Sequence, residues 1–329
     1  MINSKSKILV TGGTGSFGQF FVKTILEKFP NIKRLVIFSR DELKQYQMKM
    51  SLKKKYTGLR FFLGDIRDKE RLKRALEDID YVSHAAALKQ VDTAEYNPIE
   101  YINTNIMGAK NLIECCLDLD VKRVVALSTD KAAAPINLYG ATKLCSDKLF
   151  VAANNISPKT KCKFSVVRYG NVFGSRGSIV PYLLNNKAKK INLTDKRMTR
   201  FFITLDRGME TILWTLKNMV GGEIVVPKIP SIKITDLIQT LIPNSKINLI
   251  GIRPGEKINE EMITLTDGLN TYEVKDYYII LNNFNQQLKN KFLKFHVNAK
   301  QVKDGFAYSS DRNFFLNSYE IKKLLKKII

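Results

Sequence analysis

Short apolar runs alternate with longer amphipathic segments through the first half of the chain. The runs are typical of buried strands, and the segments that follow them repeat apolar residues at helical spacing. The predicted strands are 6–10, 34–39, 59–65, 80–87, 123–129 and 163–174, and the predicted helices include 17–29, 68–79, 103–119 and one around Tyr139. Because strand and helix alternate, we predict an α/β fold with a doubly wound parallel sheet.

The alternation ends near residue 172. Loops, short strands and Pro/Gly breaks follow, as in SRGSIVP at 175–181 and IRPGEK at 252–257. We predict a first domain over 1–172 and a smaller α/β substrate domain over 173–329, interleaved so that part of 201–227 returns to the first. The C-terminal run 318–329 has apolar residues at helical spacing between lysines. Because this run is short, docking on the body of the protein is favoured over membrane binding.

The composition is that of a folded protein rather than a disordered one. The chain has 329 residues, of which 44% are hydrophobic. No apolar run approaches the length that crosses a bilayer, and the N-terminal residues lack a signal-peptide core, so we expect a cytoplasmic protein. Four cysteines without paired spacing suit a reducing compartment. Two histidines, His84 and His296, offer too little for a zinc site or a Ser-His-Asp triad, and no metal is expected.

The formal net charge of +23 raises the question of nucleic-acid binding. The lysines are spread through nearly every segment, with short clusters on expected helix surfaces and no aromatic-basic motif. Solvated helix faces are the favoured interpretation, and we expect neither nucleic-acid nor membrane binding. An anionic small substrate would also benefit from this charge.

A glycine-rich turn follows the first predicted strand in KILVTGGTGSFGQFF, residues 7–21. Small residues let the backbone approach a pyrophosphate, and the N-terminus of the next helix supplies N–H groups and a favourable dipole. Strand, turn and helix occur in the required order, so a dinucleotide site in a Rossmann domain is favoured over a structural turn. The predicted contacts at this turn are Gly12, Thr14, Gly15, Ser16, Phe17 and Gly18.

The end of the second strand indicates which dinucleotide is bound. An acidic residue there would bind the ribose hydroxyls of NAD, whereas this chain places Ser39 and Arg40 where the 2′-phosphate of NADP would lie. We favour NADP, with Lys44 as a helper; the alternative is a surface arginine, since Asp41 is one position further along. Further cofactor contacts are predicted at Asp41 and at the ends of other strands, where Asp65 would bind the adenine amino group and Ile66, Ala85, Ala86 and Val172 would also line the site.

Four residues, Ser128, Thr129, Tyr139 and Lys143, resemble the active site of the short-chain dehydrogenase/reductase superfamily. The resemblance implies that the lysine lowers the tyrosine pKa and holds the nicotinamide ribose. The tyrosine then moves a proton to or from a substrate oxygen as hydride leaves the same carbon. A cation one helical turn away stabilises phenolate, which supports this interpretation.

Asp130 and Lys131 narrow the resemblance to the nucleotide-sugar 4,6-dehydratases, many of which carry Asp-Glu at this place. The pair occurs with YGATKLCSDKLF, VVRYGNVFGSRGS, RMTRFFIT and GIRPGEK, and the chain resembles the inverting UDP-N-acetylglucosamine 4,6-dehydratases up to about residue 260. The resemblance implies a lyase with NADP as cofactor, UDP-N-acetylglucosamine as substrate and a homo-oligomer, dimer or hexamer. It also implies the first step of pseudaminic acid biosynthesis for flagellin or surface glycosylation.

The resemblance implies a role for each residue of the chemical site. Tyr139 takes the proton of the carbon 4 hydroxyl while NADP accepts hydride, Lys131 removes the carbon 5 proton, and protonated Asp130 assists loss of the carbon 6 hydroxyl. The hydride then returns to carbon 6, and protonation of carbon 5 from the opposite face inverts that centre. Lys131 must be neutral to act as a base, so we expect burial, Lys143 and the nicotinamide to depress its pKa. The alternative is that Lys131 only pairs with Asp130.

The same motifs imply contacts with the UDP-sugar. Arginines suit a diphosphate and a glutamate suits ribose hydroxyls. The implied contacts are Lys89, Ser128, Thr129, Asn171, Ser178, Arg200, Arg253 and Glu256. Asn105 is expected to orient the active-site helix or to satisfy backbone groups. The chain departs from the family pattern at Gln90, Asp92 and Ala134 and in a shorter loop over 181–197.

Rival functions remain open at the level of sequence. A retaining 4,6-dehydratase would protonate carbon 5 on its original face, and a 4-epimerase would not need Asp130 and Lys131. A dinucleotide-sensing protein without turnover could dispense with Tyr139 and Lys143, and this chain keeps both.

Overall fold

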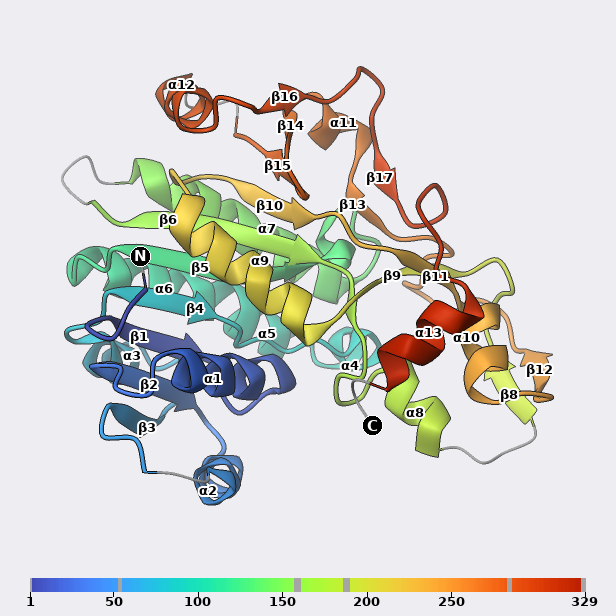
Figure 1. The fold of residues 1–329 in the computed structure, drawn as a ribbon, viewed down its shortest axis with the longest axis horizontal. Helices are drawn as coiled ribbons and strands as arrows, with labels where there is room; N and C mark the ends of the chain where they lie inside the picture. The colour runs from blue at the N-terminus through green and yellow to red at the C-terminus, as the bar shows by residue number, and fades with distance from the viewer. Residues whose placement is uncertain (1, 53–54, 157–160, 186–189, 283–285, 327–329) are drawn as a thin grey trace.

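The main sheet has parallel strands with helices on both faces (Figure 1). The computed structural model describes residues 2–52, 55–156, 161–185, 190–282 and 286–326. Within them, ten strands form one sheet in the order β16-β14-β15-β10-β6-β5-β4-β1-β2-β3. Its parallel part comprises β3 (Leu59–Leu63), β2 (Arg34–Ser39), β1 (Lys7–Thr11), β4 (Tyr81–His84), β5 (Arg123–Thr129), β6 (Lys163–Tyr169) and β10 (Ile224–Pro227). The predicted doubly wound parallel sheet is confirmed.

The strand order reverses beside β1, which pairs with β2 on one side and β4 on the other. The connections that follow β1 and β4 therefore leave the sheet on opposite faces. They open a crevice at the carboxyl ends of these two strands, where ligands of such sheets bind. Helices α1 (Ser16–Lys28) and α9 (Leu205–Asn218) contact each other on one face. On the other face, α6 (Gly108–Asp118) contacts both α3 (Lys69–Leu76) and α7 (Leu138–Ala152). Helix α2 (Glu42–Ser51) follows β2.

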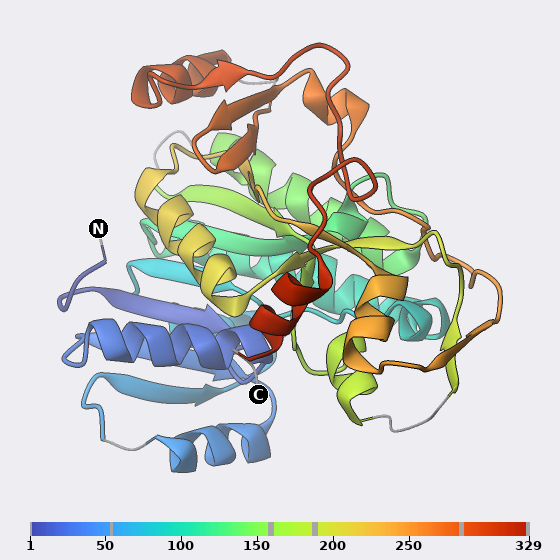
Figure 2. The same cartoon turned by 45° about the vertical axis from the view of Figure 1, so that its right-hand side comes forward.

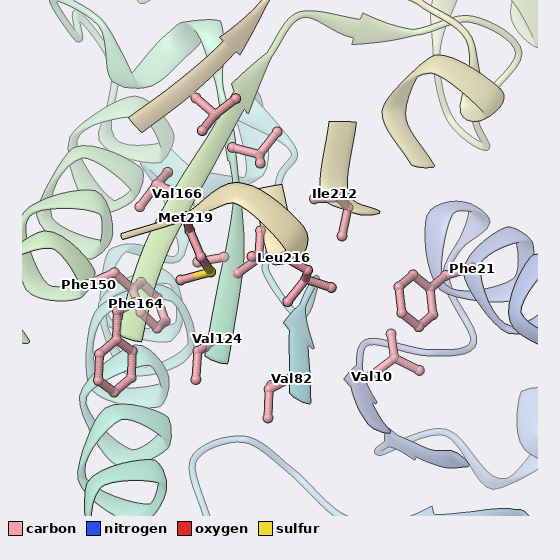
Figure 3. Close-up of a cluster of buried hydrophobic side chains, with 14 of the residues drawn as sticks. Val10, Phe21, Val82, Val124, Phe150, Phe164, Val166, Ile212, Leu216 and Met219 are labelled. Atoms are coloured by element: carbon pink, nitrogen blue, oxygen red, sulfur yellow. The ribbon is translucent and has the colours of Figure 1, made fainter. Parts of the chain in front are cut away.

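The core of this part is built from strands that are buried on both faces, as parallel strands require. Valines of four neighbouring strands, among them Val10 and Val124, lie between aromatic and aliphatic side chains of the flanking helices (Figure 3). Phe21 of α1 and Phe150 of α7 are fully buried. The rows of apolar side chains hold the strands in register, and the register places the strand ends at one edge.

Two predicted elements are interrupted in the structure. The segment predicted as a helix over 103–119 begins with a π-helical turn, η1 (Ile102–Met107), before α6. The strand predicted over 163–174 breaks at Gly170 and resumes as β7 (Asn171–Val172). At Gly170 an added Cβ would lie 2.4 Å from Cβ of Phe201. Short helices α4 (Val91–Tyr96) and α5 (Pro98–Tyr101) connect β4 to η1.

A smaller part lies beyond the carboxyl ends of the parallel strands (Figures 1 and 2). It contains the sheets β11 (Ser231–Lys233)–β9 (Thr199–Ile203)–β7 and β12 (Lys246–Leu249)–β8 (Lys190–Leu193), with α8 (Ile179–Asn185), α10 (Ile234–Leu241) and α13 (Ser318–Leu325). Helix α13 packs on α10 and buries Ile321, as expected for a docked C-terminal helix. None of the helices in the described ranges is long and apolar enough to cross a membrane.

The two parts are interleaved along the chain. Strand β10, within 201–227, pairs in parallel with β6 of the main sheet. The sheet also takes up β14 (Thr271–Val274), β15 (Tyr277–Ile280) and β16 (Lys300–Gln301), which the sequence pattern did not indicate. The remaining elements are β13 (Glu261–Ile263), β17 (Tyr308–Ser309), α11 (Leu265–Gly268), α12 (Gln286–Phe295) and the 3₁₀ turns η2 (Asp130–Ala132) and η3 (Ala153–Asn155). The division at residue 172 stays a prediction.

Candidate active site

A cleft of about 810 Å³ runs along the carboxyl ends of the parallel strands, between the two parts. Nearly every residue singled out from the sequence contributes to its wall. The cofactor candidates line it from Gly12 to Val172, the substrate candidates from Lys89 to Glu256, and the chemical candidates Thr129, Lys131, Tyr139 and Lys143 lie between them. Asp130 is fully buried and is absent from the wall.

The glycine turn after β1 leaves space that a side chain would fill. Gly12 has φ +64°, and an added Cβ would lie 2.8 Å from the backbone nitrogen of Ala86. The Thr11 hydroxyl accepts hydrogen bonds of 3.2 Å from the amides of Ala85 and Ala86 and lies 2.8 Å from Nδ1 of His84. The turn is thereby pressed against the end of β4. Its backbone and the N-terminus of α1 are open to the cleft, which fits a dinucleotide pyrophosphate.

Just after the end of β2, the carboxylate of Asp41 forms an ion pair with Lys44. Asp41 caps α2 by accepting from the backbone nitrogen of Lys44 at 2.9 Å and from its Nζ at 2.5 Å, and these hydrogen bonds lower the Asp41 pKa. The Ser39 hydroxyl accepts from Gln45. Arg40 is more than half exposed and lies 3.8 Å from Asp65. The Asp41 carboxylate is therefore engaged within its own helix, while the Arg40 guanidinium borders the cleft.

Asp65, predicted to contact the adenine, is paired with Arg67. The two side chains are 2.8 Å apart. Burial raises the Asp65 pKa, but the hydrogen bonds and charge of Arg67 outweigh this effect and leave the pKa below its ordinary value.

Helix α7 carries Tyr139 and Lys143 on one face. Its N-cap, Asn137, accepts from the Gly140 amide at 2.7 Å. Burial raises the Tyr139 pKa to about 12, against the charge of Lys131 and a hydrogen bond with Thr129, which lower it. Lys143 Nζ donates to the Leu127 carbonyl at 2.8 Å, and burial lowers the Lys143 pKa. Among the cations around Tyr139, Lys131 has the largest effect on its pKa, which corrects the expectation that Lys143 has this role.

Lys131 lies between two carboxylates. Its Nζ is 3.1 Å from Asp130 Oδ1 and 3.2 Å from Glu260 Oε1. Burial lowers the Lys131 pKa, but the two negative charges together outweigh burial and raise it above its ordinary value. The prediction of a depressed pKa is therefore wrong, because it considered the neighbouring cations and overlooked Glu260. The alternative, that Lys131 pairs with Asp130, describes part of the arrangement.

Asp130 lies behind Thr129 and Lys131 rather than in the cleft. Its Oδ1 accepts from the Thr129 hydroxyl at 2.9 Å and from Lys131 Nζ. Its Oδ2 is buried and finds no hydrogen-bond partner in the described part of the chain.

Ser128, predicted to contact the UDP-sugar, lines the cleft and also joins a buried ion-pair network. Its hydroxyl donates to Asp147 Oδ2 at 2.7 Å, and Arg168 Nη2 lies 3.3 Å from the same oxygen. Arg168 also pairs with Asp267 at 3.2 Å. Burial raises the Asp147 pKa despite these partners. The sequence reasoning missed Asp147, although its position four residues after Lys143 on the same helical face was available as a signal.

Arg200, predicted to contact the UDP-sugar, donates its hydrogen bonds to backbone groups of the protein itself. It donates to the carbonyls of Thr199, Lys257 and Ile258 at 2.7–2.8 Å, which fixes the segment that leads to Glu260. Its predicted contact with a diphosphate stays a prediction, and Arg253 is the more accessible arginine. The exposed Arg253 pairs with Asp92 at 3.2 Å, so this departure from the family pattern forms an ion pair at the cleft.

Other predicted substrate residues also lie in the wall. Asn171 and Ser178 line the cleft, and the buried Ser178 hydroxyl has no partner among the residues that the structure describes. Glu256 accepts from the Arg253 amide at 3.3 Å. Lys89 Nζ lies 3.4 Å from the Arg176 carbonyl; desolvation and the Arg176 charge lower the Lys89 pKa. These groups remain candidates for UDP-sugar contacts.

Two further residues order the loops of the site. Asn105 donates to the Leu88 carbonyl and the Thr142 hydroxyl, both at 3.0 Å, and accepts from the Leu88 amide at 2.9 Å. It satisfies backbone groups and at the same time ties α7 to the loop after β4, so both interpretations of Asn105 hold. Arg176, which sequence reasoning missed, donates to the Thr14 carbonyl at 2.5 Å and closes the 175–178 loop over the glycine turn.

The remaining departures from the family pattern are at Gln90, at Ala134 and in the loop over 181–197. The backbone carbonyl of Gln90 accepts from the Tyr101 hydroxyl at 2.6 Å, a contact that does not depend on the side chain at this position. Ala134 has φ +43°, a conformation that asparagine tolerates better than alanine. Part of the shortened loop, residues 186–189, lies outside the described residues.

Comparison with known proteins places these features in context. Residues 8–282 match the family model described as polysaccharide biosynthesis protein. The chain is 52% identical over 319 residues to the inverting UDP-N-acetylglucosamine 4,6-dehydratase of Campylobacter jejuni subsp. jejuni serotype O:2, with 94% of each chain covered. It is 36% identical to the UDP-glucose 4-epimerase of Rickettsia canadensis, with 97% of this chain and 94% of the relative covered.

The fold is likewise similar to that of a solved protein. The X-ray structure of Pen from Bacillus thuringiensis superimposes with a TM-score of 0.91 at 36% identity, and the match covers 100% of both chains. The strand order and the smaller part are therefore those of an existing structural group, and the cleft lies where such sheets bind dinucleotides.

Proposed function

The chain belongs to the polysaccharide biosynthesis protein family, and on that premise we propose that it is an inverting UDP-N-acetylglucosamine 4,6-dehydratase. As a hydro-lyase it would form UDP-2-acetamido-2,6-dideoxy-L-arabino-hex-4-ulose and water. The observation that carries the proposal is the position of Lys131, which follows Asp130 at the end of β5 and shares the cleft wall with Tyr139 and Lys143. Tyrosine and lysine alone suffice for oxidation at carbon 4, whereas elimination needs a further base and acid.

We propose NADP as the cofactor. The glycine turn would hold the pyrophosphate, Arg40 the 2′-phosphate, and Lys143 the nicotinamide ribose. The engagement of Asp41 with Lys44 supports NADP over NAD, because a carboxylate held in that pair is a poor acceptor for ribose hydroxyls. When bound, NADP supplies a reversible hydride acceptor.

Tyr139 would accept the proton of the carbon 4 hydroxyl. Its phenolate is stabilised by Lys131 and by the Thr129 hydroxyl, although burial keeps most of the phenol protonated at neutral pH. The initial rate should therefore rise with pH on the alkaline side of neutrality. Asp130 would act as the acid that assists departure of the carbon 6 hydroxyl, next to Thr129 and Lys131 in the cleft wall. Lys131 would remove the carbon 5 proton.

The UDP portion would lie along the other half of the cleft. Arg253 suits the diphosphate because its guanidinium is accessible, and Glu256, Asn171 and Ser178 offer acceptors and donors for the uridine and sugar. We further propose a homo-oligomer that acts in the cytoplasm and catalyses the first step of pseudaminic acid biosynthesis for flagellin or surface glycosylation. The basic surface would attract the anionic substrate.

The test is incubation of the purified protein with UDP-N-acetylglucosamine and no added reductant, followed by NMR in deuterated water. The expected product is the 4-keto-6-deoxy sugar of L-arabino configuration with deuterium at carbon 5. Tyr139→Phe should reduce its rate by about 10³-fold, whereas Tyr46→Phe, on the exposed face of α2, should not. An unchanged sugar would exclude the dehydratase.

The same spectra separate the rival functions. The nearest rival is a 4-epimerase, which the Rickettsia relative supports, and it would give the galacto epimer without deuterium at carbon 5. A D-xylo product from the outset would indicate a retaining dehydratase.

A further inference from the structure

The ion pairs of Lys131 leave a question about the proposed reaction. A base must offer a free amine, yet Lys131 lies between Asp130 and Glu260, and both carboxylates stabilise its ammonium form. The proton therefore needs an acceptor within reach before Lys131 can take one from the sugar. The charged and titratable groups that face Lys131 are Asp130, Glu260, Arg200 and Tyr139.

Hydrogen bonds of its backbone with Ser310 hold Glu260 beside Lys131. It precedes β13, its amide donates to the Ser310 hydroxyl at 2.9 Å, and its carbonyl accepts from the Ser310 amide at 2.8 Å. The side chain is 3% exposed, and Oε1 lies 3.2 Å from Lys131 Nζ and 3.9 Å from Arg200 Nε. Its other oxygen, Oε2, is buried and meets no hydrogen-bond partner within the described ranges.

We propose that Glu260 is the residue that receives the proton of Lys131 and so produces the free amine that acts on carbon 5. The inference rests on the function proposed above and deepens it. One N–H bond of Lys131 breaks and one O–H bond forms on Glu260. The ammonium–carboxylate pair becomes an amine–carboxylic acid pair, while Arg200 keeps its charge.

Glu260 suits this role better than Asp130 for two reasons. Asp130 Oδ1 already accepts from the Thr129 hydroxyl as well as from Lys131. Glu260 Oε1 has the single close donor Lys131 among the described residues, with Arg200 further away. Proton transfer also removes two charges from a buried site, which a filled, water-free cleft favours. Glu260 therefore acts through Lys131 as a positioning residue, and Asp130 remains free for the acid role.

The test compares Glu260→Gln with the matched control Glu261→Gln, one position further on in β13. Glutamine keeps the shape and a hydrogen-bond acceptor but is a far weaker proton acceptor. For Glu260→Gln we expect product formation and deuterium incorporation at carbon 5 to fall by about 100-fold or more. Oxidation at carbon 4 should continue, seen as a build-up of reduced nicotinamide absorbance in a single turnover. Glu261→Gln should match the parent in both steps.

A second measurement does not depend on turnover. The pH titration of Lys131 is followed by NMR of ¹³C-labelled lysine ε-carbons, with the signal assigned by its loss in Lys131→Met. In Glu260→Gln the midpoint should shift to lower pH, since one of two neighbouring negative charges is gone, and in Glu261→Gln it should not.

The outcomes are distinct. Parental turnover in Glu260→Gln, equal losses in carbon 4 oxidation and carbon 5 exchange, or an unshifted Lys131 titration would each overturn the inference. A parent protein without dehydratase activity would instead refute the proposed function, while the titration would still report whether Glu260 and Lys131 are coupled.

Discussion

The two ends of the cleft use charge in different ways. At the cofactor end, Asp41 and Asp65 pair with basic residues two or three positions along the chain, at the protein surface. At the chemical end, Lys131, Asp147 and Arg168 are largely or fully buried and pair with residues up to 129 positions away. Hydrogen bonds from neighbours lower the carboxyl pKa values at the first end, whereas burial raises that of Asp147 at the second.

This difference shows where the protein depends on its fold. A surface ion pair formed within one turn survives many changes elsewhere, and it contributes little to stability. A buried ion pair needs every partner, because removing one leaves an uncompensated charge away from water. The chemical end should therefore respond strongly to single substitutions and to pH, and the cofactor end weakly.

The largest effect is expected for Asp147→Ala. The substitution leaves Arg168 buried with Asp267 as its remaining carboxylate and deprives Ser128 of its acceptor. The free energy of unfolding should fall by about 3 kcal/mol, at the low end for a broken buried pair. Urea titration followed by circular dichroism measures it. Asp41→Ala at the cofactor end is the control and should change the urea midpoint much less; similar losses for the two variants would remove the contrast.

A smaller effect is expected from the pH dependence of His84. Burial lowers its pKa from 6.5 to about 3, with a minor effect of Lys143. Since the folded-state pKa is the lower one, the stabilisation is present above pH 6.5 and is lost as the pH falls toward 3. At pH 5, about 1.5 units below the unfolded value, the loss should be about 2 kcal/mol.

Urea titrations at pH 8 and pH 5 test this contribution by difference. His84→Gln should lose about 2 kcal/mol less between the two pH values than the parent. Subtracting the variant removes the contributions of other groups, such as the raised pKa of Asp147 and the lowered pKa of His296. Equal pH dependence in parent and variant would show that His84 is not buried in its neutral form.

The smallest effect is expected for Arg40→Ala. Because Arg40 is exposed and 3.8 Å from Asp65, its removal should leave stability nearly unchanged. The preference for NADP over NAD should fall about tenfold, or about 1.4 kcal/mol, which titration calorimetry with each dinucleotide measures. Arg67→Ala breaks the neighbouring Asp65 pair and is the control. An unaltered preference would indicate that Arg40 does not contact the 2′-phosphate.

Several features were predictable from sequence because they depend on residues close together in the chain. The strand and helix alternation predicted the parallel sheet, and the spacing of Gly12, Gly15 and Gly18 predicted the turn after β1. The spacing of Tyr139 and Lys143 predicted their common helical face. Periodicity and turn chemistry encode such features directly.

Other features depended on contacts that no local pattern records. Glu260 reaches Lys131 through the packing of β13 against η2, and Arg168 joins Asp147 to Asp267 across segments far apart in sequence. The sequence by itself showed which residues carry a charge. Folding then selected which charges lie together out of water, and because electrostatic energies depend on distance and burial, that selection set the protonation state of Lys131.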